Sequence, residues 1–189
     1  PDGRTWTGPE MVIRAAWSYP EAPGLERLSS LLLGFQNEGK WIQAKWVDPK
    51  TLQAYLDPDD SLPRQAWEHP RIFFPSYAHE WSPAMLLCAA NLTLDLNEGL
   101  LEEGWELKDA TPTNVLFDGP RPIFVDHLSP SRRKSGQMGW TAYGQFIRTF
   151  LIPLCLNRLN CVPLAWIYLA RRDGVSPQDA YDQLCMFDR

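Results

Sequence analysis

Three polar residues stand at a spacing that suits phosphoryl transfer. Asp109 is followed five residues later by Asn114, and Asp126 stands twelve residues beyond that. Such chemistry uses a carboxylate that orients the attacking hydroxyl, together with an amide oxygen and a second carboxylate that hold Mg²⁺. The order therefore predicts Asp109 as the catalytic carboxylate, and Asn114 and Asp126 as ligands of magnesium and of a nucleotide.

The surrounding residues predict a loop followed by a β-hairpin. Pro112 blocks a helix through the segment. Two short β-prone runs, residues 115–117 and 121–125, flank the turn signal Asp118-Gly119. A hairpin of this kind brings the amide and the second carboxylate to neighbouring strand ends, where two metal ligands would have to lie.

Several nearby residues have competing interpretations. Asp126 could simply cap the turn before Pro130, because Asp, Asn and Pro are common loop residues. His127 could touch the metal region, or it could be a partly exposed histidine at the end of the hairpin. His69 has no partner at metal-ligand spacing. The basic run of residues 132–134 is expected to be a solvated loop rather than a phosphate site.

The segment resembles the catalytic loop and metal-binding hairpin of the protein-kinase-like superfamily, particularly the aminoglycoside-phosphotransferase type. A closer resemblance is to bacterial SAM-dependent methyltransferases and nodulation-related proteins in which a kinase-like segment precedes a class I methyltransferase. The resemblance covers residues 70–175 and implies ATP and Mg as cofactors and a methyltransferase domain or protein as partner. The matching stretches are FPSYAHEWS at 74–82, LKDATPTN at 107–114, PIFVD at 122–126, YGQF at 143–146 and FLIPL at 150–154.

Lys45 is the expected nucleotide-binding cation of the N-terminal part. A kinase-like N-lobe has a strand lysine that reaches the nucleotide phosphates, and residues 42–45 have the alternation of a strand. An exposed strand lysine is the alternative, and Glu80 is either its acidic partner or part of a linker. The chain departs from the kinase pattern in the Leu-Lys pair before Asp109 and in lacking a glycine-rich phosphate loop. Both departures leave retained catalysis open.

The composition excludes several classes of protein. The chain has 189 residues, enough for a real core, and its net charge of −5 argues against a nucleic-acid surface. Four cysteines without C-x-x-C spacing argue against a zinc site or a disulfide framework, and Cys88 and Cys155 stand in apolar helical runs. With no signal peptide and no long apolar run, no membrane contact is expected and the chain is predicted to be cytoplasmic. No glycine motif for SAM follows Asp126, so methyl transfer is not assigned to this chain.

Helical periodicity and capping signals predict most of the regular structure. The first 70 residues are expected to be largely irregular, apart from one helix and a strand at 41–47. Ser82 is a predicted N-cap, and Gly39 and Gly104 are predicted helix stops. Helices are predicted at 25–38, 83–103, 141–151 and 163–172, and from 176 onward.

These features predict an α+β fold, mostly helical. A kinase-like C-lobe is expected over residues 76–189, with a reduced N-terminal lobe over 1–75. The leading hypothesis is a kinase-like accessory domain, a pseudokinase if catalysis is lost, that binds a nucleotide or phosphorylated ligand with Mg. The alternatives are an active small-molecule phosphotransferase and a non-catalytic protein-interaction module.

Overall fold

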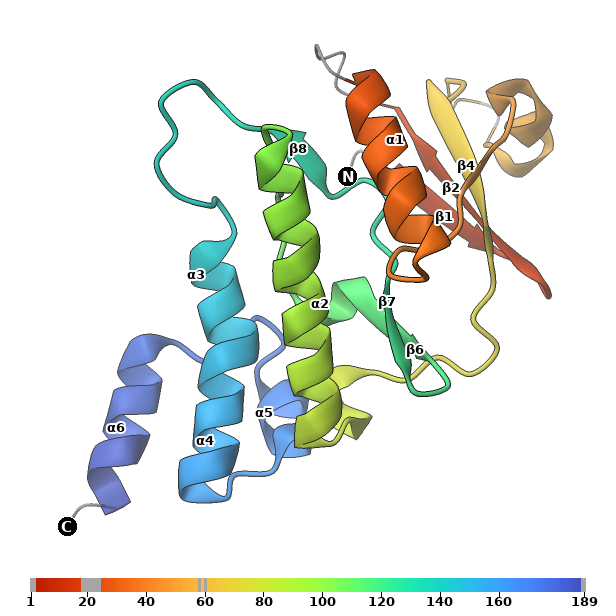
Figure 1. Ribbon diagram of the computed structural model, residues 1–189. Helices are drawn as coiled ribbons and strands as arrows, with labels where there is room; N and C mark the ends of the chain where they lie inside the picture. Colours follow the sequence, from red (N-terminus) through yellow and green to blue (C-terminus); the bar gives the residue numbers. More distant parts are fainter. Residues whose placement is uncertain (1–2, 18–24, 58, 60, 188–189) are drawn as a thin grey trace.

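The chain combines an N-terminal β-sheet with a C-terminal set of helices, joined by short strand pairs (Figure 1). The computed structural model describes residues 3–17, 25–57, 59 and 61–187. The strands are β1 (Gly3–Thr7), β2 (Met11–Ala16), β3 (Lys45–Trp46), β4 (Gln65–Pro70), β5 (Trp105–Leu107), β6 (Val115–Asp118), β7 (Arg121–Phe124) and β8 (Pro130–Arg132). The α-helices are α1 (Leu25–Asn37), α2 (Pro83–Glu102), α3 (Tyr143–Phe146), α4 (Ile152–Asn160), α5 (Leu164–Ala170) and α6 (Pro177–Phe187). The 3₁₀ turns are η1 (Pro49–Tyr55), η2 (Ala78–Glu80) and η3 (Pro112–Asn114), and the π-helical turn η4 spans Ile147–Leu151. This mixture confirms the α+β class.

The N-terminal sheet is antiparallel throughout, with the strand order β1-β2-β4-β3. Arg14 of β2 lies opposite Trp67 of β4, which in turn lies opposite Trp46 of β3. Because successive side chains alternate between the two faces of a strand, Arg14 and Lys45 point to opposite faces. The prediction of irregular structure is wrong for β1, β2 and β4. These strands are short and mix charged residues with apolar ones, so no sustained period marks them.

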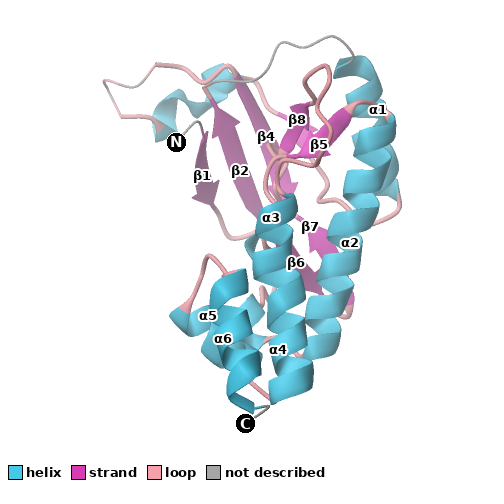
Figure 2. Cartoon of the chain, turned by 90° about the vertical axis from the view of Figure 1, so that its left-hand side faces the viewer, coloured by secondary structure: helices cyan, strands magenta, loops and turns pink. Residues whose placement is uncertain are grey.

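The two faces of this sheet have different surroundings. On one face Leu52 of η1 packs against Ala15 and Ala66, which forms a small separate core. The other face, which carries Arg14, is turned toward the β6–β7 hairpin. Figure 2 shows the sheet at one end of the molecule and α4, α5 and α6 at the other, with α2 alongside the hairpin.

Helix α2 confirms the prediction of a helix at 83–103. The hydroxyl of Ser82 accepts a hydrogen bond from the backbone N–H of Met85 at 3.3 Å, which caps the helix as predicted. On the buried side, Gly99 allows α1 to approach closely, since a Cβ there would lie 2.9 Å from the ring of Phe35. Helix α2 therefore joins α1 to the rest of the large core.

The predicted hairpin is present as β6 and β7, with Val115 opposite Phe124. The strand predicted at 41–47 is only partly present, because β3 has two residues. Trp41 instead makes an isolated parallel bridge to Phe124, and the N–H of Ile42 donates to the Phe124 carbonyl at 2.9 Å. The Trp41 and Phe124 rings lie 4.6 Å apart in the core, so burial of these rings draws the segment to the hairpin.

Helices α3 and α4 are joined without a break through the π-helical turn. Pro153 has no N–H and cannot donate to the carbonyl of Thr149, four residues earlier. The hydroxyl of Tyr168 on α5 donates to this carbonyl instead, at 2.7 Å. Burial raises the pKa of Tyr168 well above its ordinary value, so the hydroxyl remains a donor.

The same turn releases a second carbonyl. The N–H of Ile152 donates to Ile147, five residues back, and so does not reach Arg148. The Arg148 carbonyl instead accepts the N–H of Val175 at 2.9 Å. The π-helical turn before Pro153 thus leaves the carbonyls of Arg148 and Thr149 to bind the segments that follow α4.

Two further expectations concern the cysteines and a membrane-spanning helix. Cys88 stands in the apolar helix α2 but is exposed, because it lies on the outer face, whereas Cys155 is half-buried. Across the described ranges of the chain, none of the helices has both the length and the hydropathy needed to cross a bilayer.

Candidate functional site

The backbone from Asp109 to Asp126 gathers the three predicted residues around one end of the hairpin. The N–H of Asn114 donates to the Thr111 carbonyl at 3.1 Å and closes η3. The side-chain Nδ2 of Asn114 makes a long contact of 3.5 Å with the Asp109 carbonyl. The N–H of Val125, next to Asp126, donates to the Asn114 carbonyl at 2.8 Å.

Asp109 is positioned through its neighbour Ala110. The N–H of Ala110 donates to Oε1 of Gln145 at 2.6 Å, and its carbonyl accepts from the Thr149 hydroxyl at 2.9 Å. Gln145 and Thr149 are four residues apart, so side chains on one face of the helix bind both the N–H and the carbonyl of Ala110. Sequence reasoning missed this pair, whose only signal was two polar residues at helical spacing. Within the described part of the chain, the half-buried Asp109 carboxylate has no hydrogen-bond or ion-pair partner.

Asp126 is paired with Arg14. Nη1 of Arg14 lies 2.7 Å from Oδ1 of Asp126, and the same oxygen accepts the N–H of Leu128 at 3.3 Å. The two side chains are 29% and 12% exposed, so the pair is largely shielded from water. Removing one partner of such a shielded ion pair is costly, because it leaves the other charge without its counter-charge. It joins β2 of the sheet to the residue that follows the hairpin.

Lys45, the predicted phosphate-binding cation, lies elsewhere. Its side chain is exposed on the edge strand β3, opposite Glu68, on the face of the sheet that η1 covers. The structure therefore does not bring Lys45 to Asn114 or Asp126. Arg14 reaches Asp126 instead, and the sequence did not reveal this because the face of a strand residue depends on the register of its partners.

Two histidines are buried beside the ion pair. Trp41 Nε1 donates to Nδ1 of His127 at 3.3 Å, and the His127 ring lies 5.0 Å from that of Trp67 and 5.5 Å from that of His69. Burial, with smaller contributions from His69 and Arg14, lowers the pKa of His127 from 6.5 to about 3. The interpretation of His127 as a partly exposed residue is wrong, because the sheet covers the end of the hairpin.

His69 is held neutral in a similar way. Burial lowers the pKa of His69 below its ordinary 6.5, and Arg14 acts in the same direction against the hydrogen bond to the Gln43 carbonyl. That carbonyl lies 2.9 Å from Nδ1 and can only accept, so the ring proton is assigned to Nδ1. Near neutral pH, Arg14 is therefore the positive charge of this cluster.

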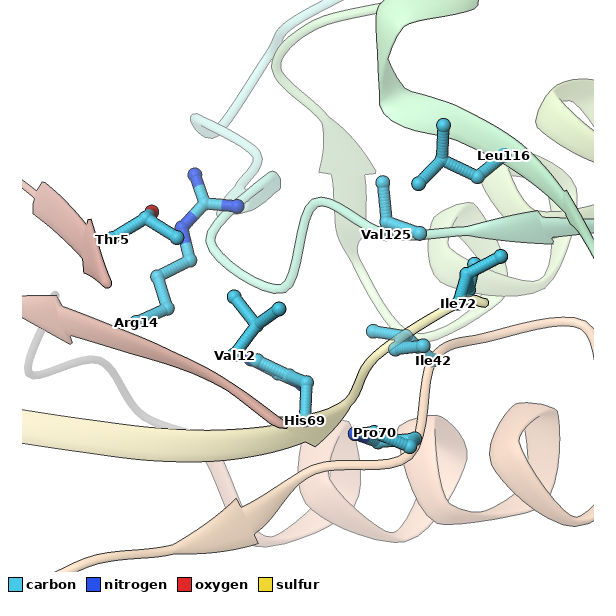
Figure 3. A pocket seen from close by; sticks show the side chains of 9 residues that line it. All are labelled: Thr5, Val12, Arg14, Ile42, His69, Pro70, Ile72, Leu116 and Val125. Atoms are coloured by element: carbon cyan, nitrogen blue, oxygen red, sulfur yellow. The ribbon is translucent and has the colours of Figure 1, made fainter. Parts of the chain in front are cut away.

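A cavity of about 210 Å³ lies between the sheet and the hairpin (Figure 3). Thr5 and Arg14, which are cross-strand neighbours, lie together at one end, and the apolar side chains of Ile72, Leu116 and Val125 lie at the other. Most of the remaining wall is apolar as well. The cavity thus has a polar end with a cation and an apolar end, the arrangement typical of small-molecule sites.

A second polar network anchors the loop that follows β8. The buried carboxylate of Glu106 accepts from Arg133 Nη1 at 2.9 Å, from Gln137 Nε2 at 2.8 Å and from the Thr141 hydroxyl. The expectation of a solvated loop at 132–134 is therefore wrong for Arg133, which neutralises a buried acid. This network fixes the loop against β5.

Comparison with known proteins shows a similarity in sequence to a nodulation protein. No protein-family model matches the chain. Nodulation protein NoeA of Rhizobium meliloti (strain 1021) is 32% identical over 181 residues, which are 95% of this chain and 36% of that protein. The chain thus spans about a third of the length of this curated relative.

Two solved structures are similar in shape. The Drosophila melanogaster PAN3 pseudokinase has a TM-score of 0.48 at 12% identity, over 94% of this chain and 49% of that chain. WbdD has a TM-score of 0.41 at 14% identity, over 99% of this chain and 42% of that chain. At these scores and identities, neither structure establishes a shared fold.

Proposed function

We propose that this chain is a kinase-like segment of pseudokinase type that binds a nucleotide or another phosphorylated ligand between the N-terminal sheet and the hairpin. The observation that carries the proposal is the ion pair between Arg14 and Asp126. Protein kinases place a basic strand residue ahead of a helix and an Asp after the catalytic loop on either side of the nucleotide phosphates. Here β2 precedes α1, and Asp126 follows the Asp109–Asn114 loop.

Two further features support this function. The cavity beside the ion pair offers an apolar end for a base and a cationic end for a phosphate. The similarity to part of a longer nodulation protein supports a role as one segment among others. The resemblance of the sequence to proteins with a methyltransferase suggests that domain as the partner.

The test is ligand-induced thermal stabilisation with a cavity-blocking variant. ATP and AMP at millimolar concentration should raise the Tm of the wild type by the mass-action stabilisation that any ligand of the folded state provides. Val12→Phe fills the cavity and should abolish the shift. The matched control is Met11→Phe on the same strand, whose side chain points to the other face and should leave the shift intact. Absence of any shift in the wild type would contradict nucleotide binding.

A second candidate is an active small-molecule phosphotransferase. It is favoured by the Asp109 carboxylate, which has no partner among the described residues, and by the firm attachment of this loop through Ala110. It would use Mg²⁺ on Asn114 and Asp126, which requires Arg14 to leave Asp126. ATP consumption across a panel of hydroxyl acceptors tests it. Asp109→Asn should lower the rate by roughly 10²–10⁴. Equal low rates in the wild type and in Asp109→Asn would leave the non-catalytic functions, which include a protein-interaction module.

A further inference from the structure

One of the oxygens expected to hold magnesium is already engaged. Oδ1 of Asp126 lies 2.7 Å from the Arg14 guanidinium and accepts a backbone N–H as well. Magnesium binds oxygens at about 2.0–2.1 Å in near-octahedral geometry and is repelled by a neighbouring cation. While the pair is intact, the cation that faces Asp126 is therefore an arginine rather than a metal ion.

The second expected ligand, Asn114, is held in place by its neighbours. The side-chain Nδ2 of Asn114 contacts the Asp109 carbonyl, and the backbone carbonyl of Asn114 accepts the N–H of Val125. Among the residues that the structure describes, no group of three or more His, Cys, Asp or Glu side chains is placed to hold a metal ion. With Arg14 paired to Asp126, a magnesium ion at this carboxylate would lie beside a guanidinium, and that positive charge opposes its binding.

The cavity wall has the opposite charge from a metal site. Of the described residues that line it, Arg14 is charged, His69 is neutral, and the rest are uncharged. Asp109, Asn114 and Asp126 do not line it. A ligand in this cavity meets a guanidinium directly, with no carboxylate between them that would need a bridging cation.

The ion pair also prepares Arg14 for an anion. A guanidinium has five N–H donors, and one terminal nitrogen, Nη1, is directed at Asp126. Among the described residues the other nitrogens have no partner, so they remain for a phosphate, whose geometry the planar group matches. Fixing the side chain in advance reduces the entropy lost on binding. Thr5, the cross-strand neighbour of Arg14, adds a hydroxyl at the same end of the cavity (Figure 3).

We infer that this cavity binds a nucleoside monophosphate, or a similar phosphate monoester with a flat apolar group, without a divalent cation. Arg14 binds the phosphate, Asp126 is the fixed counter-ion of Arg14, and the base fills the apolar end near Leu116 and Val125. The inference rests on the proposed function and specifies its ligand.

The test is calorimetric titration of AMP and ATP into the purified chain, in EDTA and in excess Mg²⁺. AMP should bind with a Kd that differs by less than about twofold between the two buffers, because no metal takes part. Arg14→Gln should weaken AMP binding by about tenfold or more, since a hydrogen bond to a charged group is lost. The matched control, Lys45→Gln, removes a cation from the other face of the sheet and should leave the Kd unchanged.

A third variant separates the possible failures. Asp126→Asn removes the negative charge but keeps an oxygen that can accept from Arg14, so AMP binding should be retained, whereas a metal site would lose it. Binding that requires Mg²⁺ and disappears in Asp126→Asn overturns the metal-free inference and leaves the proposed function standing. Binding of neither AMP nor ATP in either buffer overturns both. If Arg14→Gln does not fold, AMP binding in EDTA and in Mg²⁺ is compared for the wild type and Asp126→Asn. This comparison still distinguishes metal-free from metal-dependent binding.

Discussion

Replacing Tyr168 by Phe should destabilise the fold because it removes the donor that replaces the missing N–H of Pro153. The Tyr168 hydroxyl donates to the buried Thr149 carbonyl at 2.7 Å. Without it, that carbonyl loses its side-chain donor, and Pro153 cannot supply the usual helical N–H. The ring itself is kept, so the change isolates one hydrogen bond.

The size of the effect follows from the burial of this carbonyl. A buried polar group left without a partner costs about 1–3 kcal/mol. For a chain of this size, that corresponds to a fall in Tm of roughly 2–12 °C. Tyr143→Phe removes the hydroxyl of an exposed tyrosine and should change the stability by less than about 0.5 kcal/mol.

The assay is urea unfolding of Tyr168→Phe, Pro153→Ala and the double variant. Pro153→Ala restores an N–H four residues after Thr149, so it should recover part of the stability that Tyr168→Phe loses. The double-mutant cycle should therefore show a coupling of about 1 kcal/mol or more. Strict additivity of the two single changes would refute the idea that the tyrosine substitutes for the proline.

Three other perturbations test separate parts of the structure. Because burial lowers the pKa of His127 to about 3, the unfolded chain takes up a proton below pH 6.5 that the folded chain does not. Stability should thus fall from pH 6.5 toward pH 3, by about 2 kcal/mol at pH 5; an equally steep pH profile in His127→Gln would contradict this. Gly174→Ala places a Cβ 2.3 Å from the Arg148 carbonyl oxygen at a φ of +82°, so urea unfolding should show a larger loss than the roughly 1–2 kcal/mol expected for Gly136→Ala, which has a φ of +78° in open space. Glu106→Ala should release the loop after β8, and limited trypsin digestion should cut that loop faster than in the wild type; unchanged cleavage would show that the network does not hold it.

The parts of the fold that the sequence predicts are those with local chemical signals. Ser82 at the start of α2 and Gly119 in the hairpin turn, with a φ of +57°, act on their immediate neighbours and can be recognised without knowing the fold. The N-terminal sheet has no such signals. Its order depends on β4, a strand far downstream of β1 and β2, and that pairing is a tertiary event.

The same distinction applies to the candidate site. Asp109, Asn114 and Asp126 belong to one short segment whose turn chemistry predicts their neighbourhood. Arg14 is brought to Asp126 only by the register of the sheet and by its packing against the hairpin. Lys45 had the expected residue type but lies on the other face of the sheet, so residue type alone could not show which cation faces Asp126.

The bridge between Trp41 and Phe124 has a consequence for any attempt to divide the chain. The large core runs from α1 through Trp41 into α2 and the hairpin, across the expected boundary between residues 75 and 76. A cut at that boundary would uncover both rings and separate Arg14 from its counter-ion. We therefore expect that neither piece folds on its own, and expression of either alone should yield aggregation-prone material rather than an isolated lobe.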